Sequence, residues 1–97
     1  MDVTKSLNIV GKAIFAKYFY IFAYMTEEDC MEIMAEEYTE KSKKDKIAAA
    51  KNIFHYRKQY EALKIICSSP KVSEKTRNRA KRIMSIESVK RKYAMFT

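Results

Sequence analysis

Apolar residues recur at helical spacing through most of the chain, and this pattern predicts an all-α fold. In residues 4–25 only Lys5, Lys12 and Lys17 are charged. A helix that is apolar on nearly every side must be covered on most sides, and a short chain offers little cover. A second copy could supply it, so this segment predicts a homodimer through the first helix. Its main apolar stripe contains Leu7, Val10, Ile14, Tyr18, Ile21 and Met25.

The start of a second helix is predicted by a capping signal. Thr26 can cap a helix, and Asp29 follows three residues later, which is close to a capping box. Four carboxylates then occur at intervals of four residues, so on a continuous helix they would stack in one row and repel one another. We therefore expect the row to face cations, either in this chain or on a basic partner. The row consists of Glu28, Glu32, Glu36 and Glu40.

Two further segments account for the rest of the chain. Ser42 followed by Asp45 predicts the start of a third helix, unless the second helix continues into it. Its apolar positions form a heptad-like seam, and Pro70 predicts its end. A fourth segment begins near residues 69–70 or at Ser73, and a change of phase in its apolar positions fits one helix or two. The seam consists of Ala49, Ile53, Tyr56, Tyr60, Leu63 and Cys67.

These segments together predict one all-α domain over residues 1–97. The expected architecture is a small bundle-like arrangement of four helices, or of five if the last segment is broken. Only one glycine and one proline are present, which argues against an all-β fold. A chain of 97 residues can bury one modest core and has little room for a substrate cavity as well.

Charge divides the chain into an acidic, aromatic half and a basic half. Residues 1–40 contain three lysines and eight acidic residues, a net charge of −5, whereas residues 41–97 contain seventeen Lys or Arg and four acidic residues, a net charge of +13. The sum is the +8 of the whole chain. A basic half of this density favours a polyanion or an acidic protein surface as the partner.

The leading interpretation is a non-catalytic nucleic-acid-binding protein that uses its basic C-terminal face. Helical spacing places Lys75, Lys81 and Arg82 toward one side, with Arg79 close by. Cations on one face suit the phosphates of DNA or RNA, and binding would weaken steeply with salt. Arg57, Lys58 and Lys64 would widen this surface. The predicted contact residues are Lys75, Arg77, Arg79, Lys81, Arg82, Lys90, Arg91 and Lys92.

Two other interpretations compete with nucleic-acid binding. The basic face could simply be solvated, or it could pair with the row of glutamates. Alternatively, the protein is an inhibitor or adaptor, of a phage- or mobile-element-like kind, that docks on a host protein through charged and aromatic helix faces. The residues predicted for that protein interface are Glu28, Glu32, Glu36, Glu40, Tyr20 and Tyr24.

The sequence favours neither catalysis nor a metal or cofactor site. A single glycine is incompatible with the glycine-rich loops that cradle phosphates. His55, Cys30 and Cys67 are far apart and lack zinc-ligand spacing, and both cysteines lie in apolar stripes, as buried reduced thiols do. The uncharged stretch of residues 18–26 is about half of what a membrane span needs. We expect a cytoplasmic protein without membrane association.

Overall fold

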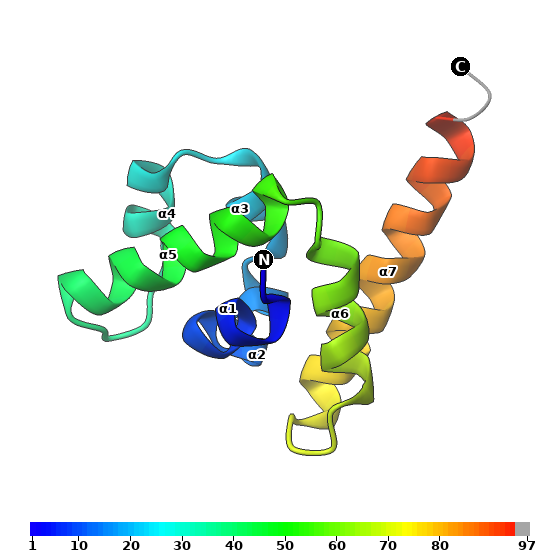
Figure 1. The fold of residues 1–97 in the computed structure, drawn as a ribbon, viewed down its shortest axis with the longest axis horizontal. Helices are drawn as coiled ribbons and strands as arrows, with labels where there is room; N and C mark the ends of the chain where they lie inside the picture. The colour runs from blue at the N-terminus through cyan, green and yellow to red at the C-terminus, as the bar shows by residue number, and fades with distance from the viewer. Residues whose placement is uncertain (95–97) are drawn as a thin grey trace.

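The structure is a computed structural model that describes the backbone of residues 1–94 and the side chains of residues 1–91. Within this part of the chain there are seven α-helices and no strand, which confirms the predicted all-α class (Figure 1). The prediction of four or five helices was too low, because two of the expected helices are broken. The helices are α1 (Val3–Val10), α2 (Lys12–Lys17), α3 (Phe19–Tyr24), α4 (Glu27–Ile33), α5 (Glu40–His55), α6 (Gln59–Ser68) and α7 (Glu74–Ala94).

The expected first helix is divided into α1, α2 and α3. Gly11 separates α1 from α2 with a φ of +91°, a conformation that residues with a Cβ rarely adopt. Its N–H donates to the carbonyl of Leu7 at 2.8 Å, so this carbonyl in the last turn of α1 has a hydrogen-bond partner. Tyr18 separates α2 from α3 with φ −110° and ψ 22°. The apolar residues on several sides of this segment can therefore all turn toward one core.

The predicted start of α4 is confirmed, but its continuation is not. The Thr26 hydroxyl accepts a hydrogen bond from the Asp29 N–H at 3.2 Å, and three acidic residues occupy the first turn. The helix ends at Ile33, so the second and third predicted helices are not continuous. The cap of the next helix lies three residues earlier than predicted, because Thr39 rather than Ser42 provides it. The Thr39 hydroxyl accepts a hydrogen bond from the Ser42 N–H at 3.1 Å.

The predicted third helix is also broken, into α5 and α6. Arg57 adopts a φ of +57° between them, so the seam from Ala49 to Cys67 does not lie on one straight helix. Tyr56, a member of that seam, is 55% exposed. The end of α6 at Ser68, just before Pro70, agrees with the prediction.

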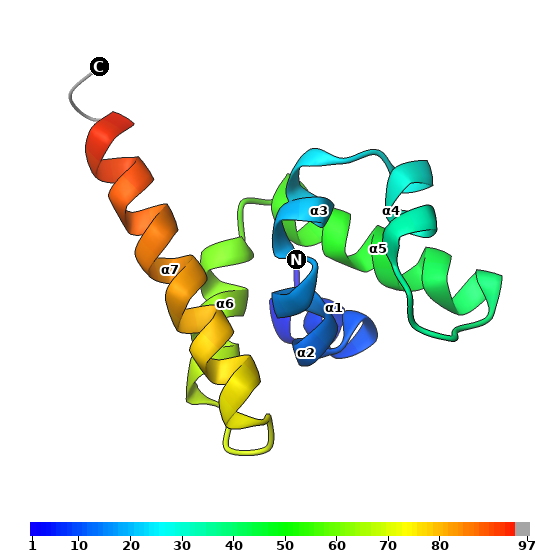
Figure 2. The ribbon, with the colours of Figure 1, turned by 180° about the vertical axis from the view of Figure 1, so that it is seen from behind.

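The last helix, α7, is continuous over 21 residues as far as the structure describes it. Ser73 begins it, as one of the two predicted starts, by accepting from the Thr76 N–H at 3.1 Å. It runs antiparallel to α6 and extends past it (Figures 1 and 2). Ala80 and Ile83 are buried, whereas Ile86 and Val89 are 41% and 53% exposed. The change of phase thus separates a first half of α7 that packs into the core from a second half whose described apolar side chains are exposed.

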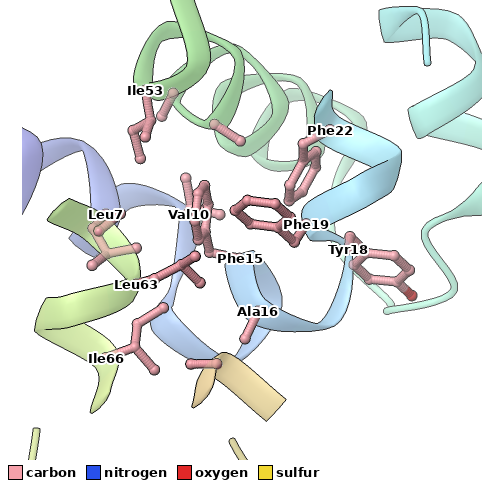
Figure 3. Close-up of a cluster of buried hydrophobic side chains, with 14 of the residues drawn as sticks. Leu7, Val10, Phe15, Ala16, Tyr18, Phe19, Phe22, Ile53, Leu63 and Ile66 are labelled. Carbon is pink, nitrogen blue, oxygen red and sulfur yellow. The ribbon is translucent and has the colours of Figure 1, made fainter. Parts of the chain in front are cut away.

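One core joins all seven described helices, and α7 contributes Ala80 and Ile83 to it. Phe15 is fully buried, with its ring centroid 5.6 Å from that of Phe19 and 5.7 Å from that of Phe54. Figure 3 shows the rings of Phe15, Phe19 and Phe22 in this core, together with Ile53 of α5 and Leu63 of α6. Burying aromatic rings of this size is a large part of the stabilisation of a small domain.

The cover that the first helix was expected to need comes from the chain itself. Leu7, Val10, Phe15 and Phe22 are 0% exposed in a single copy. Here α1 packs on α5 and α6, α2 on α7 and α3 on α5, so most of this segment is covered without a second copy.

Three lysines of α5 bind the C-terminal ends of three other helices. A cation near the last carbonyls of a helix satisfies unpaired acceptors and is favoured by the helix dipole. Much of the positive charge at the start of the basic half therefore acts within the fold. The hydrogen bonds run from Lys43 Nζ to the carbonyls of Met31 and Met34 (3.0 and 2.7 Å), from Lys46 Nζ to Ile9 and Val10 (3.1 and 3.4 Å), and from Lys51 Nζ to Met25.

Neither cysteine forms a disulfide, and burial raises the pKa of the Cys30 thiol. Cys30 is fully buried as expected, whereas Cys67 is only half-buried. Across the described helices, none is long and apolar enough to cross a membrane.

Candidate nucleic-acid interface

A surface pocket lies on the outer face of α7, in its first half. Its volume is about 490 Å³, and it is lined by Glu74, Lys75, Asn78, Arg79 and Arg82. Positions 75, 78, 79 and 82 fall on one side of a helix with 3.6 residues per turn. The structure thus brings together three of the cations that the sequence places on one face. Lys81 is exposed but does not line this pocket.

The cations of this pocket are available to a ligand. Lys75 and Arg82 are exposed and Arg79 is half-buried. None of the three forms an ion pair or a side-chain hydrogen bond with the residues that the structure describes. An arginine guanidinium presents several N–H donors in a planar fork, which matches two oxygens of one phosphate. We call Lys75, Asn78, Arg79 and Arg82 the α7 basic face.

Arg77 lies on the same helix but contributes to the fold. Its Nη1 donates to the carbonyl of Ser69 at 3.0 Å and to the carbonyl of Val72 at 2.7 Å. These bonds hold the loop between α6 and α7. Arg77 was one of the predicted contact residues, and in the structure its Nη1 is occupied by the loop.

Lys90 and Arg91 lie against aromatic rings rather than on the α7 basic face. Lys90 Nζ is 5.0 Å from the centre of the Tyr20 ring and 3.6 Å from a carboxylate oxygen of Glu87. The Arg91 guanidinium lies 3.8 Å from the centre of the Tyr60 ring. Such cation–π contacts join the protruding half of α7 to the body. The side chain of Lys92, also predicted as a contact, lies outside the described residues.

Tyr20, predicted as an interface residue, faces α7 instead. Its hydroxyl has no hydrogen-bond partner among the described side chains. Burial, together with the nearby carboxylate of Glu87, raises the pKa of Tyr20 to about 12. Tyr24 stacks on Tyr20 with ring centroids 6.2 Å apart and remains 72% exposed.

The predicted row of four glutamates does not exist as a row. Glu28 and Glu32 are exposed on α4, but Glu36 follows the end of that helix and Glu40 begins α5. The prediction failed because it required one continuous helix through residues 34–39. Glu40 contacts Lys44, four residues later, at 3.5 Å. The like charges are thus separated by a change of chain direction.

Glu36 forms an internal contact with α2 and the residue that follows it. It accepts hydrogen bonds from Lys17 Nζ at 2.6 Å and from the Tyr18 hydroxyl at 2.7 Å. Burial tends to raise the pKa of this carboxyl group, but the two hydrogen bonds outweigh it and hold the pKa below its ordinary value. We expected these glutamates to face cations. For Glu36 the cation is Lys17, which belongs to the acidic half of the chain.

The acidic and basic surfaces lie at opposite ends of the molecule. Figure 1 shows α4 and the start of α5 at one end and α7 at the other, and Figure 2 shows the same separation from behind. No ion pair links α4 to α7 among the described residues. The α7 basic face is thus not neutralised by the acidic half of its own chain.

Comparison with known proteins leaves this surface as the main guide to function. No protein-family model matches the chain, and neither a curated protein nor a solved structure matches it significantly. Within the described part of the chain, no group of three or more His, Cys, Asp or Glu side chains could hold a metal ion. His55 is exposed at the end of α5, beside the ring of Tyr56.

A second group of cations was missed by the sequence analysis. Lys12, Lys46 and Lys71 line another pocket, although they belong to three separate segments. No spacing rule connects positions so far apart, so only the tertiary structure reveals this group.

Proposed function

We propose that the protein binds nucleic acid through the α7 basic face. The observation that supports the proposal is that some cations are bonded to the fold whereas others are left free for a ligand. Lys43, Lys46, Lys51 and Arg77 donate to backbone carbonyls of the fold, whereas Lys75, Arg79 and Arg82 have no such partner among the described residues. Three unpaired cations on one exposed helix face favour a polyanion as the ligand.

The geometry of the face suits the sugar–phosphate backbone. The cations follow one another along the helix, at the first, second and third turns of α7. They can therefore contact successive phosphates, and the Asn78 amide between them can donate to a phosphate or to a base edge. Helix α7 lies at one end of the molecule (Figure 1), and Lys75 and Arg82 are exposed on it. No element of the face selects DNA over RNA.

Fluorescence anisotropy with labelled duplex DNA, single-stranded DNA and RNA tests this function. The informative variant is Lys75→Glu/Arg82→Glu, because both side chains are exposed and the fold does not depend on them. A matched control is Lys5→Glu/Lys41→Glu, which makes the same change in net charge at exposed positions away from α7. We expect the first variant to abolish binding and the control to weaken it slightly.

The salt dependence gives a second, quantitative readout. If three cations each neutralise one phosphate, the logarithm of the binding constant should fall with the logarithm of salt concentration with a slope of roughly −2.7 for duplex DNA. Lack of binding at low salt to all three ligands, or equal effects of the two variants, would refute the proposal. The protein-docking interpretation would then become the leading one, with the exposed Glu28, Glu32 and Tyr24 as its first targets.

A further inference from the structure

The second pocket lies at the junction between α1 and α2, against α5 and the loop that precedes α7. Its volume is about 470 Å³, which is within the range of small-molecule sites. Lys12 from α2, Lys46 from α5 and Lys71 from the loop line it, and no aspartate or glutamate does. None of these lysines forms an ion pair with a described carboxylate. The three lysines bring positive charge to a hollow whose lining contains no carboxylate, and a bound anion would offset that charge.

Lys46 is held in place at this pocket. Its Nζ donates to the carbonyls of Ile9 and Val10 at 3.1 and 3.4 Å, and it lies 4.8 Å from the centre of the Tyr38 ring. An ammonium group has three N–H donors, so one remains after these two bonds. Because the lysine is already fixed, a ligand would not have to order this side chain.

Two hydroxyl groups add donors to the same lining. Thr76 is a buried polar side chain, with 8% of it exposed, and it lines the pocket. Its hydroxyl and that of Ser73 are 3.1 Å apart and share one hydrogen bond. The Ser73 oxygen also accepts from the Thr76 N–H. Two hydroxyl groups carry two protons and their mutual bond engages one, so the other can be donated to an anion.

The geometry points to a phosphate-binding pocket, and we propose that it binds a phosphate group carried by a compact ligand of nucleotide size. A phosphate supplies several acceptor oxygens and negative charge, which matches three ammonium groups and a hydroxyl donor. Val10, Ile14 and Val72 provide apolar walls beside the cations, as small-molecule sites commonly have. This proposal does not rest on nucleic-acid binding by α7, because the two pockets have no lining residue in common.

Isothermal titration calorimetry of the whole chain at low salt tests the pocket with pyrophosphate, adenosine monophosphate and adenosine. We expect saturable binding of the two phosphorylated ligands with a dissociation constant of about 1 mM or lower, and none of adenosine. Tighter binding of adenosine monophosphate than of pyrophosphate would identify a nucleotide as the source of the phosphate. The reverse order would identify a free anion.

Two variants locate the binding site. Lys12→Gln/Lys71→Gln should weaken pyrophosphate binding at least about tenfold. The control Lys5→Gln/Lys41→Gln, which removes the same charge elsewhere, should weaken it far less. Thr76→Val tests the hydroxyl without a large change of shape, and its thermal unfolding shows whether the fold is retained.

Three results would overturn the pocket proposal: no saturable heat with either phosphorylated ligand, binding of adenosine as tight as that of the monophosphate, or equal loss in the two lysine variants. The variant Lys75→Glu/Arg82→Glu separates the two proposals. It should leave pyrophosphate binding within about twofold while it abolishes binding to nucleic acid.

Discussion

Tyr18→Phe tests a contact that ties the N-terminal helices to the segment between α4 and α5. The Tyr18 hydroxyl donates to Glu36 at 2.7 Å and accepts from the Ala35 N–H at 3.2 Å. The side chain is 6% exposed, and its ring packs against Phe22 with centroids 6.1 Å apart. The substitution removes the hydroxyl and keeps the ring, so the measured change reports the polar contact.

The expected magnitude follows from the charge of the acceptor. A hydrogen bond to a charged group contributes about 1.5–3 kcal/mol, and Lys17 remains as a second donor to Glu36. We therefore expect the free energy of unfolding to fall by about 2 kcal/mol. In a domain of this size each kcal/mol corresponds to roughly 4–8 °C in melting temperature, so a decrease of roughly 8–16 °C should accompany it.

Urea unfolding followed by circular dichroism at neutral pH measures this change. Tyr56→Phe is a matched control, because Tyr56 is 55% exposed and its hydroxyl makes no hydrogen bond with the described residues. If the free energy of unfolding falls no more for Tyr18→Phe than for Tyr56→Phe, the reasoning is refuted. Equal slopes of the two denaturation curves would show that only stability has changed.

The pH dependence of the same difference provides an internal check. The pKa of Glu36 lies below its ordinary value of 4.5 in the folded protein. The contact is therefore fully stabilising above that value and is lost as the pH falls through the lower pKa of the folded state. The difference in free energy of unfolding between wild type and Tyr18→Phe should become smaller as the pH drops below 4.5. A difference in unfolding free energy that does not narrow as Glu36 becomes protonated in the folded protein would contradict ionisation of Glu36 as its cause.

Other parts of the fold give three further expectations. Phe15→Ala should lower the free energy of unfolding by about 3–5 kcal/mol in urea, whereas Ile9→Ala at a 44% exposed position should lower it by less than about 1 kcal/mol. The pKa of Tyr20 is raised to about 12, so an ultraviolet titration should contain one tyrosine that ionises late, and Tyr20→Phe should remove that step. Arg77→Ala should lower the free energy of unfolding by about 1–3 kcal/mol and speed amide hydrogen exchange in residues 69–73. Unchanged exchange in these residues would contradict the role of Arg77 in holding the loop.

Local signals in the sequence were reliable where one residue controls the backbone. Thr26 and Ser73 begin helices as predicted, and α6 ends just before Pro70. The breaks at Gly11 and Arg57 were missed because apolar residues continue at helical spacing on both sides of each. Apolar periodicity indicates which residues become buried. It does not reveal a break in the helix when the residues on both sides of the break stay buried.

For the candidate site too, the sequence predicts what depends on local spacing and misses what depends on tertiary packing. Lys75, Arg79 and Arg82 could be grouped from the sequence because they share one helix and helical spacing fixes their side. The loss of Arg77 to the loop, and of Lys90 and Arg91 to tyrosine rings, depends on which elements pack against α7. Those partners lie 5 to 70 positions away in the chain, so no local rule identifies them.

The attachment of the N-terminal helices to α5 has a consequence for synthesis of the protein. The helices α1, α2, α3 and α4 contain eight residues or fewer, and isolated helices of that length are marginal in water. The carbonyl ends of α1, α3 and α4 are bound by Lys46, Lys51 and Lys43, which are translated after all four helices. The first third of the chain thus lacks its support while it leaves the ribosome, and it can settle into its native form only once residue 51 has followed it.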